Sequence, residues 1–419
     1  MQLRWSSRRA MSKRGRPRVG PATRHGFNLL EVLIAMFVLT IGMLGVAAAV
    51  SMGNFLAVRA LIADRAAAVG RNALAEVRAR EMLDPRGWTA PDGTPVLPIN
   101  DLDAPLPLGD APGGKAGEAF CIDPLYIAWT LQANGLQPHL DRFPFYDPNT
   151  MLTMSRVTLN WAPPDSADYF GRLFRAEDDL LFENAALSRP RMLFRAAGVN
   201  AVPLPAMAWE SPPGPPLRAD CQGLYSWMVT VVPMAAPGVP ARNQKYAVSV
   251  VVFRNRDMTW RDDPTAEAPA ERAATVNFLG QGIGGGDVRL SFNPQAGQDG
   301  FAALDVAEGQ WLLLGGMLPS NPPDPPRKVF VWYRVLSAGE TYGPATHPHP
   351  FGGDSARYYR ELTLAGPDWN LNWNAPGGTD SDGDGILLEA QAVILPNVYG
   401  VYTETVEPDR SAPWSFRRQ

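Results

Sequence analysis

The sequence predicts an α+β fold, in which a long N-terminal helix packs on an antiparallel β-sheet head and a second β-rich unit follows. Three observations lead to this prediction. An apolar run begins at Phe27, and no proline occurs from there to Met82. Two segments rich in β-branched and aromatic residues, 224–233 and 246–254, are typical of strands. Similar segments follow a charged, Ala- and Pro-rich stretch at 257–275, which we take as a boundary between units.

The first half of the predicted helix, residues 27–50, is long enough to cross a membrane. Its 24 residues include one charged side chain, Glu31. At 1.5 Å per residue they span about 36 Å, and a bilayer core is about 30 Å thick. Residues 1–26 hold eight Lys or Arg and no Asp or Glu. The positive-inside rule therefore keeps this basic leader in the cytoplasm and sends the rest of the chain across the membrane.

The second half of the helix reads as an amphipathic continuation that ends near Met82, before Asp84-Pro85-Arg86-Gly87. Its apolar side chains recur at spacings that place them on one face, and we expect this face to pack on the head. These residues are Val58, Leu61, Ile62, Val69, Ala73 and Val77.

The head is predicted to occupy residues 83–260, and the second β-rich unit residues 261–419. In the head, residues 83–150 are Pro- and Gly-rich and are expected to form an irregular connection. A strand is predicted at 154–161 and a short helix or turn at 175–182. The second unit has five strand candidates, at 287–292, 310–314, 329–336, 358–364 and 392–406.

Composition and charge fit a folded, exported protein. Apolar residues make up 46% of the chain and charged residues 19%, which is ordinary for a globular protein. The net charge is −4, but removing the leader leaves 30 basic residues against 42 acidic ones, a net charge of −12. Nucleic acid is therefore not expected as a partner of the exported part.

Glu31 is the most informative residue of the apolar run. A carboxylate inside a membrane span costs about 2.5–3.5 kcal/mol on insertion scales. The simple explanation, that it reaches the headgroups, lowers this cost but gives no reason for its presence. A basic segment, Gly26, Phe27 and an apolar helix with one acid at position 31 together resemble the N-terminus of type IV pilin-like proteins. This family includes pilins, minor pilins and the pseudopilins of type II secretion. Asn28 stands where Thr or Ser is common.

The resemblance implies processing and assembly. A prepilin peptidase would cut between Gly26 and Phe27, and the new N-terminus would be N-methylated. In the filament, Glu31 would compensate the amine of a neighbouring subunit. The implied partners are other pilins or pseudopilins, the peptidase, the inner-membrane assembly platform and the membrane. The implied location is the inner membrane, with one span and the C-terminal part in the periplasm or on the cell surface.

The size of the chain points to a specialised subunit. The resemblance covers the N-terminal 60 residues strongly, the first sheet weakly and the rest of the chain hardly at all. It fits a minor pilin of the pilus modification type or a large minor pseudopilin, at a filament tip or in initiation. Two alternatives stay open: an adhesin or binding module that uses the same export route, and a single-pass anchored protein. No nucleophile, P-loop or zinc-helix motif is found, so no enzymatic activity is expected.

The best candidate metal site is the acidic loop 380–385. Asp380, Asp382 and Asp384 alternate with small residues, and glycines follow, a pattern that lets several oxygens converge on Ca²⁺. The pattern departs from an EF-hand because its twelfth position is Gln391, and the nearest acid is Glu389. Ca²⁺ in an irregular loop is the preferred interpretation over a plain acidic turn, and some large pseudopilins bind Ca²⁺ near their C-termini.

Three further features allow more than one interpretation. Cys121 and Cys221 are the only cysteines, and in an exported chain a pair is expected to be bridged, although two unrelated buried thiols fit the spacing equally well. The glycines at 280–285 match a dinucleotide-binding pattern, but a strand follows them, which favours an inter-strand loop. His347 and His349 lie in a Pro-rich stretch that is typical of a surface loop.

Overall fold

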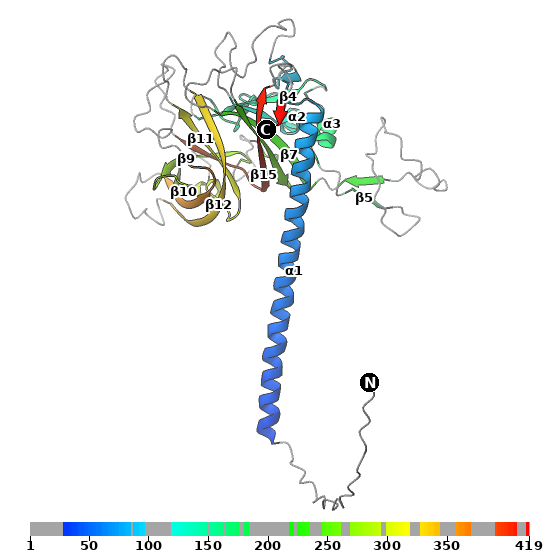
Figure 1. Cartoon of the computed structure of the whole chain (residues 1–419), viewed down its shortest axis with the longest axis vertical. Helices are drawn as coiled ribbons and strands as arrows, with labels where there is room; N and C mark the ends of the chain where they lie inside the picture. The colour runs from blue at the N-terminus through cyan, green and yellow to red at the C-terminus, as the bar shows by residue number, and fades with distance from the viewer. Residues whose placement is uncertain are drawn as a thin grey trace, which may run out of the picture. The chain divides into compact units, whose positions relative to one another are not determined.

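The computed structural model describes residues 28–84, 87–96, 119–148, 151–161, 164–175, 180–183, 218–221, 224–234, 245–260, 269–294, 299–318, 327–343, 357–369, 390–408 and 416–418. The chain divides into two compact units, residues 1–61 and 62–419. A long N-terminal helix, a β-sheet and a closed β-barrel confirm the predicted α+β class (Figure 1).

Helix α1 (Leu29–Ala79) is one unbroken helix of 51 residues. At its start, the backbone carbonyl of Asn28 accepts hydrogen bonds from the N–H groups of Glu31 and Val32. At its end, Glu81 takes a φ of 50°, and Met82 N–H donates to the Val77 carbonyl at 3.0 Å. This is a Schellman-type stop, so the helix ends three residues before the predicted Met82 and before Pro85 is reached.

The first sheet has eight strands in the order β1-β4-β2-β7-β8-β15-β16, and β3 also pairs with β4. All its pairs are antiparallel except β2 with β4, which is parallel and is connected through helix α2 (Pro124–Asn134). The strands are β1 (Trp88–Thr89), β2 (Phe120–Ile122), β3 (Arg142–Phe143), β4 (Met154–Leu159), β7 (Tyr225–Met234), β8 (Lys245–Arg254), β15 (Val398–Pro408) and β16 (Phe416–Arg418).

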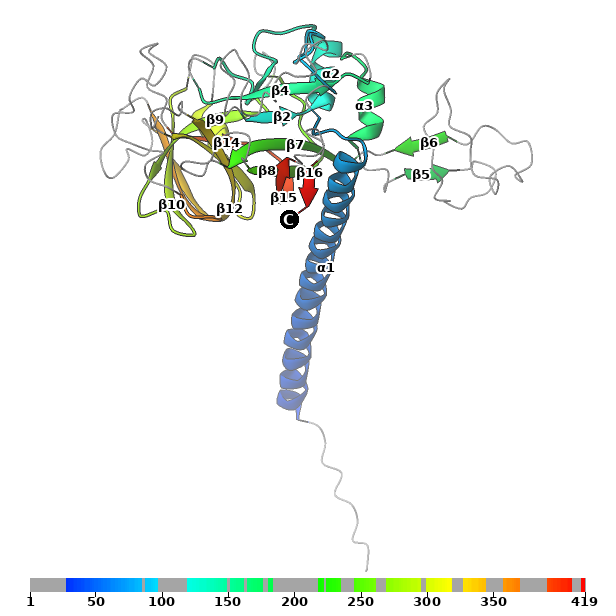
Figure 2. The same cartoon turned by 45° about the horizontal axis from the view of Figure 1, so that its top comes forward.

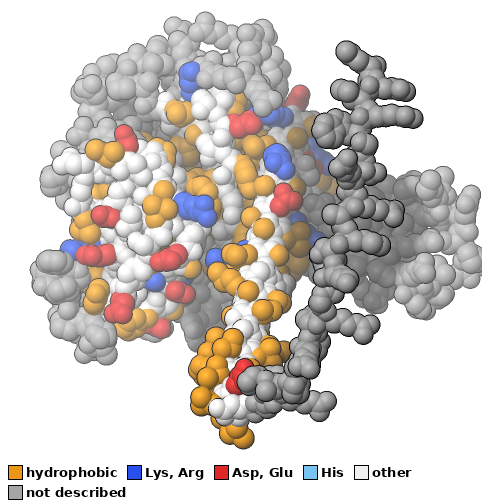
Figure 3. Space-filling view, turned by 60° about the horizontal axis from the view of Figure 1, so that its bottom comes forward, with side chains coloured by type: hydrophobic (Ala, Val, Ile, Leu, Met, Phe, Trp, Pro, Cys, Tyr) orange, Lys and Arg blue, Asp and Glu red, His pale blue; other side chains and the backbone are white. Residues whose placement is uncertain are grey.

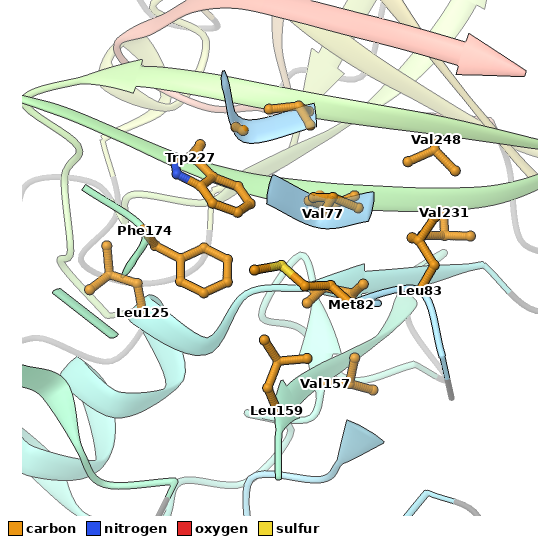
Figure 4. Close-up of a cluster of buried hydrophobic side chains, with 14 of the residues drawn as sticks. Val77, Met82, Leu83, Leu125, Val157, Leu159, Phe174, Trp227, Val231 and Val248 are labelled. Atoms are coloured by element: carbon orange, nitrogen blue, oxygen red, sulfur yellow. The ribbon is translucent and has the colours of Figure 1, made fainter. Parts of the chain in front are cut away.

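Residues 62–83 cover one face of this sheet. Ala66, Val69, Ala73 and Val77 recur every three or four residues and are buried against alternate side chains of β7 and β8. Figure 4 shows Val77, Met82 and Leu83 packed among Phe174, Trp227, Val157 and Val248. The predicted apolar face is thus correct from Val69 onward, whereas Val58 and Leu61 are exposed.

Buried side chains on the opposite face of the sheet pack against a closed barrel. Met228 and Phe253 of the sheet share one core with Leu313, Phe330 and other barrel side chains. Trp332 Nε1 donates to Thr230 Oγ1 across this contact at 3.2 Å. Burial on both faces explains why β7 and β8 read in the sequence as nearly continuous apolar runs.

The barrel is antiparallel, with the strand order β10-β13-β12-β11-β14-β9 (Figure 2). Side chains such as Leu290, Leu314 and Tyr333 fill its interior. Helix α4 (Gly300–Ala303) lies at one end, where Arg272 donates to the carbonyls of Ala302 and Asp305. The strands are β9 (Arg272–Phe278), β10 (Gly285–Phe292), β11 (Trp311–Leu318), β12 (Arg327–Tyr342), β13 (Tyr358–Ala365) and β14 (Gln391–Ile394).

The barrel is inserted between two neighbouring strands of the first sheet. Strand β8 ends at Arg254, β15 begins at Val398, and these two strands pair directly. The Arg254 N–H also donates to the Asn397 carbonyl at 3.0 Å. The range 261–419, predicted as a separate β-rich unit, therefore gives its last two strands, β15 and β16, to the first sheet. Local pattern could not reveal this return, because strand pairing is non-local.

Two local predictions were wrong. Residues 83–150 were expected to be irregular, yet they contain β1, β2, α2 and β3. The short helix or turn expected at 175–182 overlaps strand β5 (Leu180–Glu183), which pairs with β6 (Arg218–Cys221), and the helix of this region, α3 (Ala167–Leu173), lies earlier. Both errors come from weighing Pro, Gly and charge locally, when tertiary pairing decides the structure.

Candidate functional site

The exposed part of α1 is the first candidate site. Every residue from Asn28 to Leu61 is exposed, and apolar side chains cover this stretch (Figure 3). Within the described part of the chain, α1 is the helix long and apolar enough to cross a membrane. The structure therefore supports membrane association through one N-terminal span.

The exposed apolar surface is longer than the hydrocarbon core of one bilayer. Residues 29–61 span about 50 Å of helix, whereas about 20 residues suffice to cross a bilayer core. The stretch 52–61 still exposes large apolar side chains by about half: Met52, Phe55, Leu56, Val58 and Leu61. Its one charged residue is Arg59, whose guanidinium lies 5.1 Å from the centre of the Phe55 ring. Residues 52–61 thus extend the exposed apolar surface past the length of one bilayer core.

Glu31 lies in the first turn of α1 and is exposed. A carboxylate at a helix N-terminus is favoured by the helix dipole, typically by about 0.3–1 kcal/mol. The cost of roughly 2.5–3.5 kcal/mol applies to an acid at the centre of a membrane span, whereas Glu31 stands at the N-terminal end of the helix. The predicted cleavage residues Gly26 and Phe27 lie outside the described residues.

A second candidate is a buried network of four charged side chains on the barrel-facing side of the sheet: Asp123, Arg156, Arg256 and Glu271. Asp123 caps α2 and accepts two hydrogen bonds from Arg256, at 2.8 and 2.5 Å. Arg156, on β4, donates to Glu271 Oε1 and lies 3.9 Å from Asp123. The Arg156 guanidinium also lies 4.5 Å from the centre of the Tyr126 ring.

Three members of the network, Asp123, Arg156 and Arg256, have pKa values shifted in the direction that favours their charged forms. Burial alone would raise the pKa of Asp123, but the charge and hydrogen bonds of Arg256, with Arg156 nearby, hold that pKa below its ordinary value. Burial would lower the pKa of Arg156, and the carboxylates of Glu271 and Asp123 raise it instead. The two guanidinium groups face two carboxyl groups, so removing one member leaves a buried group without its partner.

Sequence reasoning missed this network, although signals for parts of it were present. Arg156 stands two residues after Met154 in the predicted strand, so alternation places both on one face. Asp123 followed by Pro124 is a typical start of a helix. Glu271, 115 residues after Arg156, had no local signal of its role.

The predicted calcium ligands Asp380, Asp382, Asp384 and Glu389 lie outside the described residues, in the connection between β13 and β14. The two histidines at 347 and 349 also fall outside them. Within the ranges that the structure describes, no three His, Cys, Asp or Glu side chains come together as a metal site.

Cys121 is buried, and its Sγ lies 3.9 Å from Met228 Sδ. Burial raises its pKa well above the ordinary value, and the nearby Asp123 carboxylate adds to the effect. Cys221 ends strand β6, but its side chain is not among the described ones. The bridge between the two cysteines therefore stays a prediction.

The Gly-rich segment 280–285 connects β9 to β10. Gly282 and Gly284 have positive φ angles of 68° and 64°. The carbonyl of Gly282 accepts from Trp369 N–H, and Gly284 N–H donates to Asp368. The segment is thus joined to the residues after β13 and precedes a strand, whereas a dinucleotide-binding loop precedes a helix.

Comparison of the chain with protein-family models, curated proteins and solved structures finds no match.

Proposed function

We propose that this chain is a minor pilin or minor pseudopilin. A prepilin peptidase would process it at Gly26, and α1 would then place it in a type IV pilus or type II secretion pseudopilus, at the tip or in initiation. The proposed route runs through the inner membrane, with the C-terminal part in the periplasm or at the cell surface. This role requires no catalytic site in the chain.

The observation that carries the proposal is the length of the exposed apolar surface on α1. A simple anchor needs about 20 apolar residues, but exposure of apolar side chains continues to Leu61. Exposed apolar surface of this extent outside lipid marks a protein interaction site. A bundle of similar helices would cover residues 52–61 as well as the membrane span.

Glu31 fits the same proposal. It is the one acid between Asn28 and Leu61, and it stands at the helix end where the processed N-terminus would be. The amine of a neighbouring Phe27 would supply the opposite charge that Glu31 needs in a low dielectric. We expect the pair to fix the register of neighbouring helices more than to add net stability.

A photo-cross-linking experiment tests the proposal. A photoreactive residue is placed at Phe55 or at Leu56 in the full-length protein expressed in its own host. Both sites lie past the membrane span and are exposed, by 53% and 52%. Assembly through α1 predicts cross-links to other helical membrane subunits, and these cross-links should disappear in Glu31→Ala while membrane insertion persists.

The matched control is a photoreactive residue at Leu336, an exposed apolar position of the barrel (57%). It should not give the same cross-linked species. Cross-links from position 55 to lipid alone would contradict assembly and favour a simple anchor. Unchanged protein cross-links in Glu31→Ala would contradict the role given to the carboxylate.

The alternative role is an adhesin or binding module on the same export route. The closed barrel favours it, because this insertion has its own core and is not needed to complete a pilin-like sheet. A variant that no longer enters a filament but still binds surfaces or partners through its exported part would support this alternative.

We also propose Ca²⁺ as the ligand of the acidic loop 380–385. Alternating Asp residues followed by Gly support this assignment. In that position the ion would order the connection between β13 and β14 and relieve repulsion among the carboxylates.

A further inference from the structure

We propose that Glu271 is a docking latch through which the inserted barrel orders the described residues of the β3–β4 connection in the first sheet, 144–148 and 151–153. This inference concerns the coupling between barrel and sheet, and it holds whether or not the chain enters a filament.

Glu271 immediately precedes β9, the first strand of the barrel, and is 3% exposed. Both of its carboxylate oxygens are used by the other part of the fold. Oε1 accepts from Arg156, on β4, and Oε2 accepts from the backbone N–H of Phe145 at 2.8 Å. One side chain therefore serves a buried cation and a buried backbone donor at the same time.

A second barrel side chain acts on the same connection. The Oε1 atom of Gln391, on β14, accepts from the backbone N–H of Leu152 at 2.7 Å. On β12, Lys328 Nζ donates to the carbonyl of Thr153 at 3.4 Å. The barrel thus supplies partners to backbone groups near both ends of the β3–β4 connection. Without the docked barrel, two buried N–H groups would lose their acceptors.

The charge balance makes Glu271 the decisive contact. Asp123 is already engaged by two hydrogen bonds to Arg256, and it lies 3.9 Å from Arg156, beyond hydrogen-bond distance. Among the described residues, Nε and Nη1 of Arg156 have no hydrogen-bond partner. Removing the charge of Glu271 would leave two buried guanidinium groups against one carboxylate, which strongly destabilises a buried network.

The next residue, Arg272, ties the latch to the barrel itself. Its guanidinium donates to the carbonyls of Ala302 and Asp305 at the α4 end of the barrel. Glu271 and Arg272 thus connect, through adjacent positions of one chain segment, the interior of the first sheet to the end of the barrel. A shift of the barrel would therefore move the carboxylate that accepts from the Phe145 N–H and the Arg156 guanidinium.

Hydrogen exchange with mass spectrometry on the full-length protein in detergent tests the latch. The variant Glu271→Gln keeps the size of the side chain and removes its charge. We expect exchange in peptides covering 142–153 to rise about tenfold or more, because the neutral amide no longer balances the buried charge of Arg156. Peptides from β7 and β8 should change little. The control Glu361→Gln neutralises the carboxylate of the half-buried Arg289–Glu361 pair on the barrel and should leave 142–153 unchanged.

A double variant separates the latch from a general loss of stability. In R156M/E271Q the unbalanced cation is gone, and the amide introduced at position 271 still offers an oxygen to the Phe145 N–H. Protection of 142–153 should therefore return toward that of the wild type. Recovery of a folded double variant when E271Q does not fold would also support the latch. Unchanged exchange in 142–153 in folded E271Q would overturn it, and so would equal loss of protection in all strands or failure of both variants to fold.

Discussion

Replacing Gly70 with alanine should weaken the contact between α1 and β15. Gly70 lies in the buried stripe of α1, against the ring of Tyr402. A Cβ at position 70 would lie 2.9 Å from Cγ of that ring and closer still to Cδ2. Because Cγ is the root of the ring, a small rotation of the ring tip does not relieve the clash.

Two opposing effects set the magnitude. Alanine in place of glycine inside a helix is favourable by about 0.5–1 kcal/mol. Overpacking a well-packed contact costs about 1–3 kcal/mol. Because the added Cβ would lie under 3.0 Å from ring atoms of Tyr402, the upper part of this cost applies, and we expect Gly70→Ala to lower the free energy of unfolding by about 1–2 kcal/mol. In a Tyr402→Ala background the clash is absent, and the same substitution should instead stabilise the protein by about 0.5–1 kcal/mol.

The assay is a double-mutant cycle measured by urea unfolding of the full-length protein in detergent, followed by tryptophan fluorescence. The matched control is Gly53→Ala, a helical glycine where an added Cβ would meet no heavy atom within 4 Å. This control should not destabilise the protein. A Gly70→Ala protein as stable as the wild type, or no change of sign in the Tyr402→Ala background, would refute the packing of α1 on β15.

Three other predictions concern the core, the buried charges and the acidic loop. Trp332→Phe removes the hydrogen bond to Thr230 across the barrel contact and should cost about 1 kcal/mol in a urea titration, whereas no loss would count against that contact. The pKa of Asp123 is lowered on folding, so its contribution is complete above its unfolded pKa of about 3.9 and is lost as the pH falls through the folded value. The thermal midpoint should therefore hold from about pH 7 to pH 5 and drop below about pH 4, and a smaller drop is expected in Asp123→Asn. For the acidic loop 380–385, adding EDTA should lower the thermal midpoint of the protein, and adding Ca²⁺ should restore it. A midpoint that EDTA does not change would rule out the Ca²⁺ site and favour a plain acidic turn.

The parts of the fold that could be predicted are those with a strong local pattern. Helix α1 was predictable because no helix breaker interrupts its apolar run, and β7 and β8 because burial on both faces gives continuous β-branched sequence. The start of α2 had a usable signal in Asp123-Pro124, but the surrounding Pro and Gly residues outweighed it.

The closure of the barrel and the return of the chain to the first sheet could not be predicted, because both depend on pairing between distant strands. Strand β15 pairs with β8 across more than a hundred residues of inserted chain. The buried network could not be predicted for the same reason, because Glu271 meets its partner Arg156 only in the folded chain. Charged residues in a sequence predict a solvated surface until their partners are known.

The most direct test of the proposed function is the mass of the mature N-terminal peptide from the native host. Processing as a pilin-like subunit predicts a peptide that begins at Phe27 and carries an N-methyl group, and blocked cleavage in a variant of Gly26. A mature protein that retains residues N-terminal to Phe27 would contradict the proposed function.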